Sequence, residues 1–258
     1  MKIYSWNMMF FNAKQDLAFE FIEQSNFDIF CLQEVPEEFL ERLKTLPYFI
    51  TFRVDEELIC AKCNKNIYIV ILSKYPFVAT GEISFPDYWM HMHTRSRLFI
   101  RLMRPFNIFK ARNHGGLYCD LIKDGKTIRV FSLHVKMLAR PEWRLKEFET
   151  AMEKHDISLP TIVCGDLNIF DNLYFMPLNW LLGSRLRDIL FYRAERILFE
   201  KKFTAYRFIN ALRGKITHPL SRSQLDHILV SDSFSIKNAE VIPNRIGSDH
   251  HPVRVEIE

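Results

Sequence analysis

Short apolar runs that end abruptly in polar residues are the main pattern along this chain. The clearest run begins at Thr161 and leads into Gly165-Asp166-Leu167-Asn168. A short apolar run bounded by glycine predicts a buried strand. Because side chains two residues apart on an extended chain point to the same side, Asp166 and Asn168 can both face one pocket at the end of that strand. Taken alone, the motif also fits a polar exit from strand to loop.

The first part of the chain alternates between strand and helix patterns. The two strands end at Asn7 and at Gln33-Glu34, and Asn12 is the expected N-cap of the first helix. Apolar strands that alternate with amphipathic helices are typical of sheets buried between layers. The pattern predicts strands at 2–6 and 27–32 and helices at 13–25 and 36–46.

From residue 48 onward, strands follow one another with few helices between them. Asp124-Gly125 between two apolar runs predicts a hairpin, and the second of these runs ends at His134. The predicted strands are 48–53, 67–73, 77–85, 95–103, 117–122, 127–134, 160–165, 225–230, 236–242 and 253–257, and the predicted helices are 142–155 and 172–182.

No Gly-, Ser- or Pro-rich linker and no low-complexity tract interrupts the chain, so we expect residues 1–258 to form a single domain. Weak internal symmetry is visible, because each half opens with a strand that ends in a polar residue, Asn7 in one half and Asp166 in the other. The expected fold class is therefore α+β, with two mainly antiparallel sheets packed face to face and helices on the outside.

Charge is distributed unevenly along the chain. The formal net charge is only +4, but two windows, 88–119 and 201–225, contain no Asp or Glu and several Lys and Arg residues. Such windows suit a phosphate-rich partner, although a solvated cationic face without a partner is the alternative. Candidate substrate-binding residues are Arg97, Arg101, Arg112, Arg213, Lys215 and Tyr206, and Tyr88, Trp89 and Phe208 are further candidates for stacking.

Other features exclude several classes of protein. The composition, 48% hydrophobic and 26% charged, excludes a disordered chain, and no P-loop or dinucleotide-binding glycine pattern is present. Cys31, Cys119 and Cys164 lie in apolar runs and are expected to be buried thiols in a reducing compartment. Cys60 and Cys63 form a lone C-x-x-C without a second ligand pair, so a structural zinc is not expected. Without a signal-peptide or membrane-span pattern, a cytoplasmic location is expected.

Eight polar side chains lie at the ends of predicted strands or directly after them, and strand ends on one side of a sandwich converge. They are Asn7, Glu34, His134, Asp166, Asn168, Asp226, Asp249 and His250. The surrounding motifs, in order, are Trp6-Asn7, Leu32-Gln33-Glu34, Ser132-Leu133-His134, Gly165-Asp166-Leu167-Asn168, Leu225-Asp226-His227-Ile228 and Ser248-Asp249-His250. Because these motifs run in this order from end to end, the chain resembles the endonuclease/exonuclease/phosphatase superfamily, which has the four-layer α-β-β-α, DNase I-like fold.

The resemblance implies a divalent metal ion, Mg²⁺ or Mn²⁺, with Glu34 as its main carboxylate ligand and Asn7 and Asp249 nearby. Oxygen ligands without thiolates suit such a hard cation. It also implies that Asp226 orients His250, which activates water, and that Asp166 shares this task.

Asn168 and His134 are implied to hold phosphate oxygens. In the family a Tyr or a His fills the position of His134, and its role as an acid or only a donor stays open.

The sequence thus predicts a metal-dependent nuclease or DNA phosphodiesterase that acts as a monomer on nucleic acid, DNA rather than RNA. A phosphodiesterase or phosphatase for a small-molecule, inositol or lipid phosphate is the alternative, since the same chemistry serves both. A binding protein that has lost catalysis is a third possibility, and the intact set of motifs argues against it.

Overall fold

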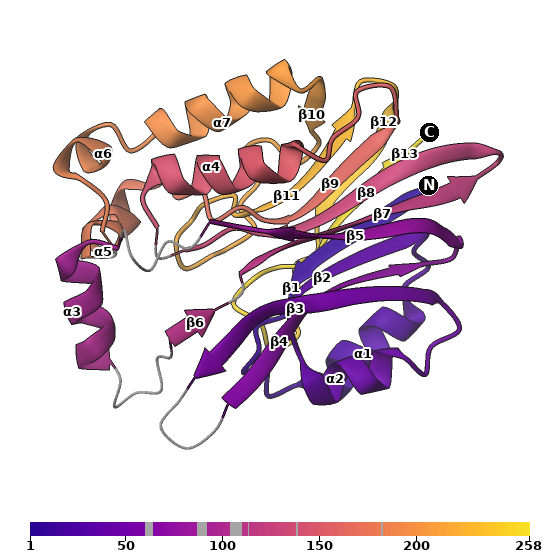
Figure 1. Cartoon of the computed structure of the whole chain (residues 1–258), viewed down its shortest axis with the longest axis horizontal. Helices are drawn as coiled ribbons and strands as arrows, with labels where there is room; N and C mark the ends of the chain where they lie inside the picture. The colour runs from indigo at the N-terminus through magenta and orange to yellow at the C-terminus, as the bar shows by residue number, and fades with distance from the viewer. Residues whose placement is uncertain (60–63, 87–91, 104–109, 113, 138, 182) are drawn as a thin grey trace.

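The computed structural model describes residues 1–258 except 60–63, 87–91, 104–109, 113, 138 and 182. Two β-sheets pack face to face, with helices on both outer surfaces (Figure 1). The first sheet contains, in spatial order, β12 (Ile236–Val241), β13 (Val253–Ile257), β1 (Lys2–Asn7), β2 (Ile29–Pro36), β4 (Asn64–Ser73), β3 (Phe49–Ile59) and β6 (Lys110–Arg112). The second contains β10 (Phe208–Asn210), β11 (Asp226–Ser231), β9 (Thr161–Asp166), β8 (Lys126–His134), β7 (Gly115–Lys123) and β5 (Phe77–Ser84).

The core between the sheets is built from alternate residues of their facing strands. Ile3 and Ile29 from the first sheet pack against Val130, Ile162 and Ile228 from the second, and all five are buried. Inner faces that interdigitate in this way are the usual core of a β-sandwich. The buried thiols Cys31, Cys119 and Cys164 lie in this core as small apolar side chains, as predicted.

Helices cover the outer faces of both sheets and complete the four layers. α1 (Gln15–Gln24) and α2 (Glu37–Leu43) cover the first sheet, and α4 (Pro141–Met152) and α7 (Ala194–Ala205) cover the second (Figure 1). None of the helices in the described ranges has the length and apolarity needed to cross a membrane. The predicted α-β-β-α sandwich is confirmed.

Each sheet contains one parallel strand pair whose connection carries a helix. β1 and β2 are parallel and joined through α1, and β8 and β9 are parallel and joined through α4. The registers place Asn7 beside Gln33 and His134 beside Asp166. This repeated unit is the internal symmetry expected from the sequence. It brings the C-terminal ends of four strands to one end of the sandwich, opposite the two chain termini (Figure 1).

Two local predictions change. The segment predicted as a strand at 95–103 is helix α3 (Thr94–Met103), in which Ser96 is buried while Leu98 and Leu102, one turn apart, are exposed. A short apolar run does not distinguish the two periods, and here packing decided for the helix. Asn12 does not cap α1. Its amide donates to the carbonyls of Met8 and Ile246 instead.

The region between Asn168 and Asp226 holds elements that were predicted only in part. The helical segment expected at 172–182 is η3 (Leu173–Phe175) followed by α5 (Met176–Leu181). α6 (Leu186–Leu190), α7 and β10 were not predicted. The Asp124-Gly125 hairpin is confirmed, because both residues have the positive φ angles, 50° and 74°, that a two-residue hairpin turn requires.

Candidate active site

The convergent strand ends carry the polar side chains singled out in the sequence. Asn7, His134 and Asp166 are the last residues of β1, β8 and β9, and Asp226 is the first residue of β11. Because β11 runs antiparallel to β9, its first residue lies at the same edge as the last residue of β9, and Asp226 pairs directly with Asp166. The fold thus gathers residues separated by more than half the chain.

Two β-bulges aim further carboxylates at this edge. The register of β2 against β4 shifts between Leu32 and Val35, and Glu34 in this bulge has a φ of 55°. The register of β3 against β4 shifts between Val54 and Glu56, which leaves Asp55 as the extra residue. Bulges redirect a side chain and are frequent beside active sites. Both bulges lie against the same short stretch of β4, next to Tyr68.

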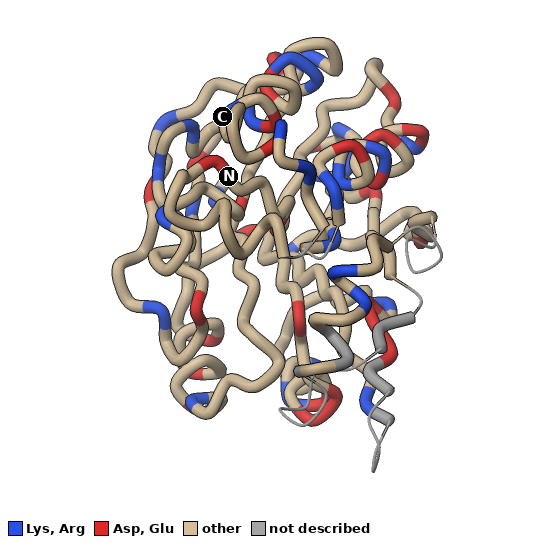
Figure 2. The backbone as a smooth tube through the Cα atoms, turned by 90° about the vertical axis from the view of Figure 1, so that its left-hand side faces the viewer, with Lys and Arg blue, Asp and Glu red and all other residues tan. Residues whose placement is uncertain are grey.

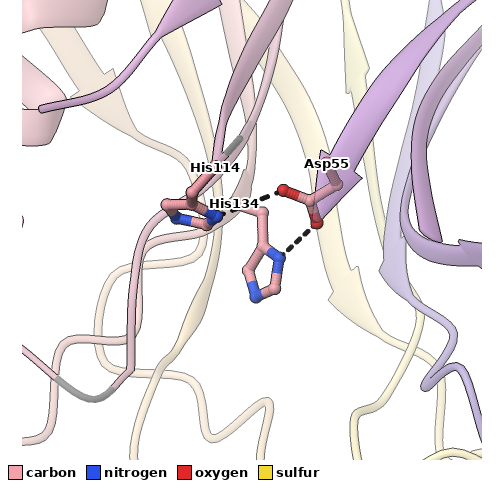
Figure 3. Close-up of side chains that lie close together, drawn as sticks. All are labelled: Asp55, His114 and His134. Atoms are coloured by element: carbon pink, nitrogen blue, oxygen red, sulfur yellow. Dashed lines mark hydrogen bonds and ion pairs between the residues drawn. The ribbon is translucent and has the colours of Figure 1, made fainter. Parts of the chain in front are cut away.

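Two imidazole–carboxylate pairs face one another across the site. His250 Nδ1 lies 2.8 Å from Asp226 Oδ2, and its Nε2 lies 3.7 Å from Asp166 Oδ2. His134 Nδ1 lies 2.6 Å from Asp55 Oδ2, and its Nε2 lies 3.7 Å from Glu34 Oε1. Figure 3 shows the second pair together with His114. In both pairs the carboxylate fixes the ring through Nδ1 and leaves Nε2 turned toward the remaining carboxylates.

Two asparagines order the centre of the site. Asn7 Nδ2 donates to Glu34 Oε1 at 3.0 Å and to Asp166 Oδ2 at 3.1 Å, so it connects the two sheets. Its Oδ1 accepts from the backbone N–H of Met9 at 3.1 Å. In this orientation Asn7 presents its NH₂ group to the carboxylates, and its metal-binding role through oxygen stays a prediction. Asn168, with a φ of 50°, donates through Nδ2 to the Val135 carbonyl.

Burial and mutual charge perturb the titration of these groups. Burial raises the pKa of Glu34 and of Asp166, because it penalises their charged forms. Burial acts against the charged form of His250, but the attraction of Asp226 and Asp166 prevails and raises its pKa to about 10. In the same way, Asp55 outweighs burial and raises the pKa of His134 well above its usual value. The site therefore holds excess negative charge that stabilises cations.

The segment after β12 closes the site. Ser248 donates to the Asn7 carbonyl at 2.8 Å and accepts from the His250 N–H at 3.0 Å, which fixes the Ser248-Asp249-His250 turn against β1. Asp249 Oδ2 lies 3.6 Å from His218 Nε2. Burial opposes the charged form of Asp249, but His218 and His250 outweigh it and lower its pKa to about 2.

The donors of this site fit a divalent cation. His218, Asp249 and His250 could hold a metal ion, and Glu34 is close enough for Asp249 to influence its pKa. These donors are carboxylates and imidazoles without a thiolate, a set that suits Mg²⁺ or Mn²⁺ at the oxygen ligands.

A sequence profile of the Endonuclease/Exonuclease/phosphatase family matches residues 4–250, which span all the motifs described above. The chain belongs to this family. The family comprises nucleases and phosphatases that hydrolyse phosphoester bonds, generally with a divalent metal ion. A search of curated proteins by sequence found no match.

Solved structures with the same fold come from proteins with different substrates. An endonuclease/exonuclease/phosphatase from Beutenbergia cavernae is 14% identical, with a TM-score of 0.70 over 100% of this chain and 71% of its own. A mannosyl-6-phosphatase from Bacteroides thetaiotaomicron is 17% identical, with a TM-score of 0.65 over 100% of this chain and 99% of its own. The 3′ phosphatase NExo from Neisseria, solved with a product DNA hairpin, is 17% identical, with a TM-score of 0.60 and coverage of 100% and 99%. At these identities the likeness establishes the endonuclease/exonuclease/phosphatase fold.

The structure brings all eight motif residues to one end of the sandwich and adds two that the sequence analysis missed. Asp55 lies in the segment Val54-Asp55-Glu56-Glu57, whose sequence is typical of a solvent-exposed charged strand. Only the β-bulge turns its side chain inward. His218 lies in a loop without periodicity, and its ring is 4.7 Å from that of His250 between centroids. No local sequence signal distinguishes either residue.

The predicted substrate-binding residues do not form one group. Arg97 is exposed on α3, and the side chains of Arg101 and Arg112 lie outside the described side chains. Arg213 is mostly exposed and lies 3.6 Å from Glu200, and Lys215 donates to the Ala239 carbonyl at 2.8 Å.

Tyr206 lies at the end of the second sheet away from the site, and its role in substrate binding stays a prediction. It precedes β10, whose Phe208 pairs with Ser231 at the end of β11 opposite Asp226. Phe208 is buried, and Tyr88, Trp89 and the Cys60/Cys63 pair lie outside the described residues.

Acids from elsewhere in the chain pair with two basic residues of the 201–225 window. Glu149 lies 2.6 Å from Lys202, and Asp232 lies 2.8 Å from Arg207. Seen from the side of the site, Lys and Arg segments alternate with Asp and Glu segments (Figure 2). An acid-free stretch of sequence therefore does not by itself make a positive surface.

Among the described residues, one cleft is lined mainly by basic side chains. It has a volume of about 590 Å³ between α7 and the 211–224 segment. Two of its lining residues are close to site residues along the chain, Asp171 to Asn168 and Gln224 to Asp226. Its basic lining residues are Arg193, Arg196, Lys201, Arg213, Lys215 and Arg222, against the acids Asp171 and Glu200.

Proposed function

We propose that this protein is a divalent-metal-dependent phosphodiester hydrolase that acts on nucleic acid, DNA in the first place. The observation that carries the proposal is the pair of buried imidazole–carboxylate dyads, His250–Asp226 and His134–Asp55, on two sides of Glu34, Asn7 and Asp166. Hydrolysis of a phosphodiester needs one group to activate water and another to stabilise or protonate the departing oxygen. Two dyads on opposite sides of one pocket meet both needs.

His250 is assigned the general-base role. Asp226 holds Nδ1, so Nε2 is the atom that takes the proton from water, and Asp166 beside it stabilises the resulting imidazolium. Before a cation binds, a pKa of about 10 keeps the His250 imidazole protonated at neutral pH. Positive charge added near Asp249 and Glu34 lowers this pKa, so a bound cation favours the neutral form that acts as a base.

His134 is assigned the role of hydrogen-bond donor on the opposite side. Its pKa lies well above the usual value, so it carries a proton at neutral pH and presents Nε2–H toward the pocket. The Asn168 side chain, already engaged with the Val135 carbonyl, adds a fixed dipole at the same edge. Donors held before substrate arrives stabilise developing charge without reorganisation.

Glu34 and Asp249 are proposed to hold the metal, with Asn7 as a further oxygen donor. Mg²⁺ or Mn²⁺ there would neutralise phosphate charge and the excess negative charge of the site. The basic cleft that begins beside Gln224 supports a substrate with several phosphates, because a single small phosphate would leave its basic side chains unused.

A phosphatase for a small or lipid phosphate is the second candidate. It is favoured by one observation, the ion pairs of Glu149 and Asp232 with Lys202 and Arg207 of the second basic window. Such a substrate needs charge only at the reaction centre. It would use the same dyads and the same metal.

The test is a substrate panel with purified protein, in Mg²⁺, in Mn²⁺ and in EDTA. The panel contains plasmid, single-stranded and abasic DNA, RNA, a 5′-tyrosyl DNA, inositol phosphates and bis(p-nitrophenyl) phosphate. We expect metal-dependent turnover of a DNA substrate that Glu34→Gln abolishes and Glu20→Gln, on the exposed face of α1, leaves unchanged. Turnover of inositol phosphates alone would establish the second candidate, and full activity in EDTA would exclude both.

A further inference from the structure

A second cluster of ligand-type side chains lies behind His134, on the side away from Glu34. Asp55 occupies the centre, with His134 Nδ1 2.6 Å from Oδ2 and His114 Nδ1 3.3 Å from Oδ1 (Figure 3). Glu56 Oε1 lies 3.2 Å from the same His114 nitrogen. One ligand atom each from Asp55, His114 and His134 falls within 4.8 Å of the others, and all three side chains are buried.

Hydrogen bonding accounts for the contact between His134 and Asp55 but not for the position of His114. Neither ring nitrogen of His114 has a hydrogen-bond partner, and Asp55 Oδ1 has none either. The short distances from His114 Nδ1 to two carboxylates therefore lack the alignment that a hydrogen bond requires. Buried polar atoms normally find partners, and orphaned ones need an explanation. A nitrogen and two carboxylate oxygens that converge without hydrogen bonding are arranged as ligands are.

A buried carboxylate, Glu147, lies near the distal nitrogen of His114, the position at which a metal-binding histidine has its outer partner. Its Oε2 lies 3.7 Å from His114 Nε2, the nitrogen that points away from Asp55. The Lys136 N–H donates to the same oxygen at 2.8 Å and holds the carboxylate in place. Glu147 is fully buried within α4, and its Oε1 has no partner. A carboxylate on the distal nitrogen fixes the ring and its tautomer while the proximal nitrogen binds metal.

We propose that Asp55, His114 and His134 form a second, buried metal site, with Glu56 as the fourth ligand and Glu147 as the group that orients His114. Two imidazoles and two carboxylates favour a transition-metal cation such as Zn²⁺ over Mg²⁺. The two carboxylates neutralise a divalent ion. Binding at His134 Nδ1 displaces one proton to solvent and leaves Nε2–H directed at the catalytic pocket. The ion stands apart from the one proposed at Glu34 and Asp249.

The test is a Zn²⁺ titration of the metal-stripped full-length protein in excess Mg²⁺, followed by calorimetry and by elemental analysis of the retained ion. We expect one tight equivalent, with proton release that changes with buffer. His114→Asn should weaken this equivalent at least ~100-fold, and Glu147→Gln by ~10–100-fold, the usual effect of losing an outer-shell partner. The matched control is His155→Asn, whose ring packs on Phe208 with centroids 4.9 Å apart and should have no effect.

Two further variants separate this site from the catalytic one. His218→Asn removes a donor from the His218, Asp249 and His250 group and should keep the tight Zn²⁺ equivalent. Glu34→Gln should abolish hydrolysis and still bind Zn²⁺, so failure of the catalytic proposal leaves this one testable. Equal Zn²⁺ affinity in the wild type and both the His114 and Glu147 variants, or no tight equivalent in the wild type, would show that the cluster is an ion-pair network only. If His114→Asn does not fold, Glu147→Gln alone decides.

Discussion

Asp166 on β9 lies directly opposite Asp226 on β11, and both carboxylates are buried at the edge of the second sheet. Like charges directly across a pair of strands destabilise a sheet. His250 lies against both, with Nδ1 2.8 Å from Asp226 and Nε2 3.7 Å from Asp166, and its positive charge offsets theirs. The catalytic proposal rests on this unit, because the imidazole is both fixed by one carboxylate and stabilised by the other.

Asp226 and His250 should behave as one functional unit in a double-mutant cycle. General-base catalysis contributes ~10²–10⁴-fold, so His250→Ala and Asp226→Asn should each lower kcat by amounts within that range. The double variant should be little worse than the worse single one, because each change already disables the pair. Asp226→Asn is nearly isosteric and Asp226 Oδ1 has no hydrogen-bond partner, so the fold should be preserved. Losses that multiply would show independent roles.

Glu34 should control the metal dependence of the reaction. Glu34→Gln keeps the shape of the side chain and removes the charge of a partly buried carboxylate, so kcat should fall at least ~10²-fold. The Mg²⁺ concentration for half-maximal rate should rise in the same variant. Glu20→Gln, exposed on α1, is the control for the substitution itself. A Glu34 variant with unchanged metal dependence would remove Glu34 from the proposed ligand set.

In protein free of Zn²⁺, Asp55 should be needed to hold His134 in its protonated form. Burial opposes that form, and Asp55 is the largest of the influences that raise the pKa of His134. Asp55→Asn should therefore lower this pKa and reduce kcat by ~10²-fold, as losing a preorganised donor does. The measurement is the pH profile of kcat, whose alkaline limb should move to lower pH. Asp120→Asn, which breaks an ion pair with Arg129 at 2.7 Å, is the matched control and should leave the profile in place.

The motif residues could be predicted because each ends or begins an apolar strand, as Asn7, His134, Asp166 and Asp226 do. Sheet topology then brings such ends together without further information. Asp55 could not be predicted, because a bulge reverses the side to which a strand residue points, and nothing in Val54-Asp55-Glu56 marks the bulge.

Two helices were missed for different reasons. α7 has Glu195, Phe199 and Phe203 buried at a spacing of four, a pattern that the sequence contains and that predicts a helix. Because residues 201–225 are basic, the sequence analysis interpreted this region as a binding surface and predicted no helix. α3 is different, because its apolar residues are partly exposed and its period is fixed by packing that the sequence does not show.

His227 should make the fold sensitive to acid. Its Nδ1–H donates to the Leu225 carbonyl at 2.8 Å and its Nε2 accepts from Arg196, so the ring is neutral. Burial and then the charge of Arg196 lower its pKa well below the usual value of about 6.5. Below that pH the unfolded chain binds a proton that the folded chain does not. The free energy of unfolding therefore decreases as the pH is lowered.

Below about pH 6, His227 alone should change the free energy of unfolding by up to ~1.4 kcal/mol per pH unit. The measurement is urea denaturation of the wild type and of His227→Gln between pH 5 and 8. The variant should lack this slope, and above about pH 7.5 the plots of unfolding free energy against pH should run parallel for the two proteins. Identical slopes for wild type and variant in the acid range would mean that His227 titrates alike in both states.

The basic cleft should determine how strongly binding of nucleic acid depends on salt. Condensed counterions leave a phosphate backbone when cationic side chains contact it, so log K falls linearly with log salt, and each phosphate contact adds roughly one unit to the slope. An Asp166→Asn protein, which is expected to bind without turnover, should show a steep slope on a short DNA. Replacing Lys201, Arg213 and Arg222 by Ala should reduce that slope by roughly one unit each, since all three line the cleft beside Gln224.

The matched control is Arg207→Ala. Arg207 belongs to the same acid-free window but precedes β10 at the opposite end of the sheet, so this change should leave the slope unchanged. A slope near zero at the outset, or equal reductions from the cleft variants and from Arg207→Ala, would exclude the nucleic-acid substrate and favour a small or lipid phosphate, whose charge reaches only the reaction centre.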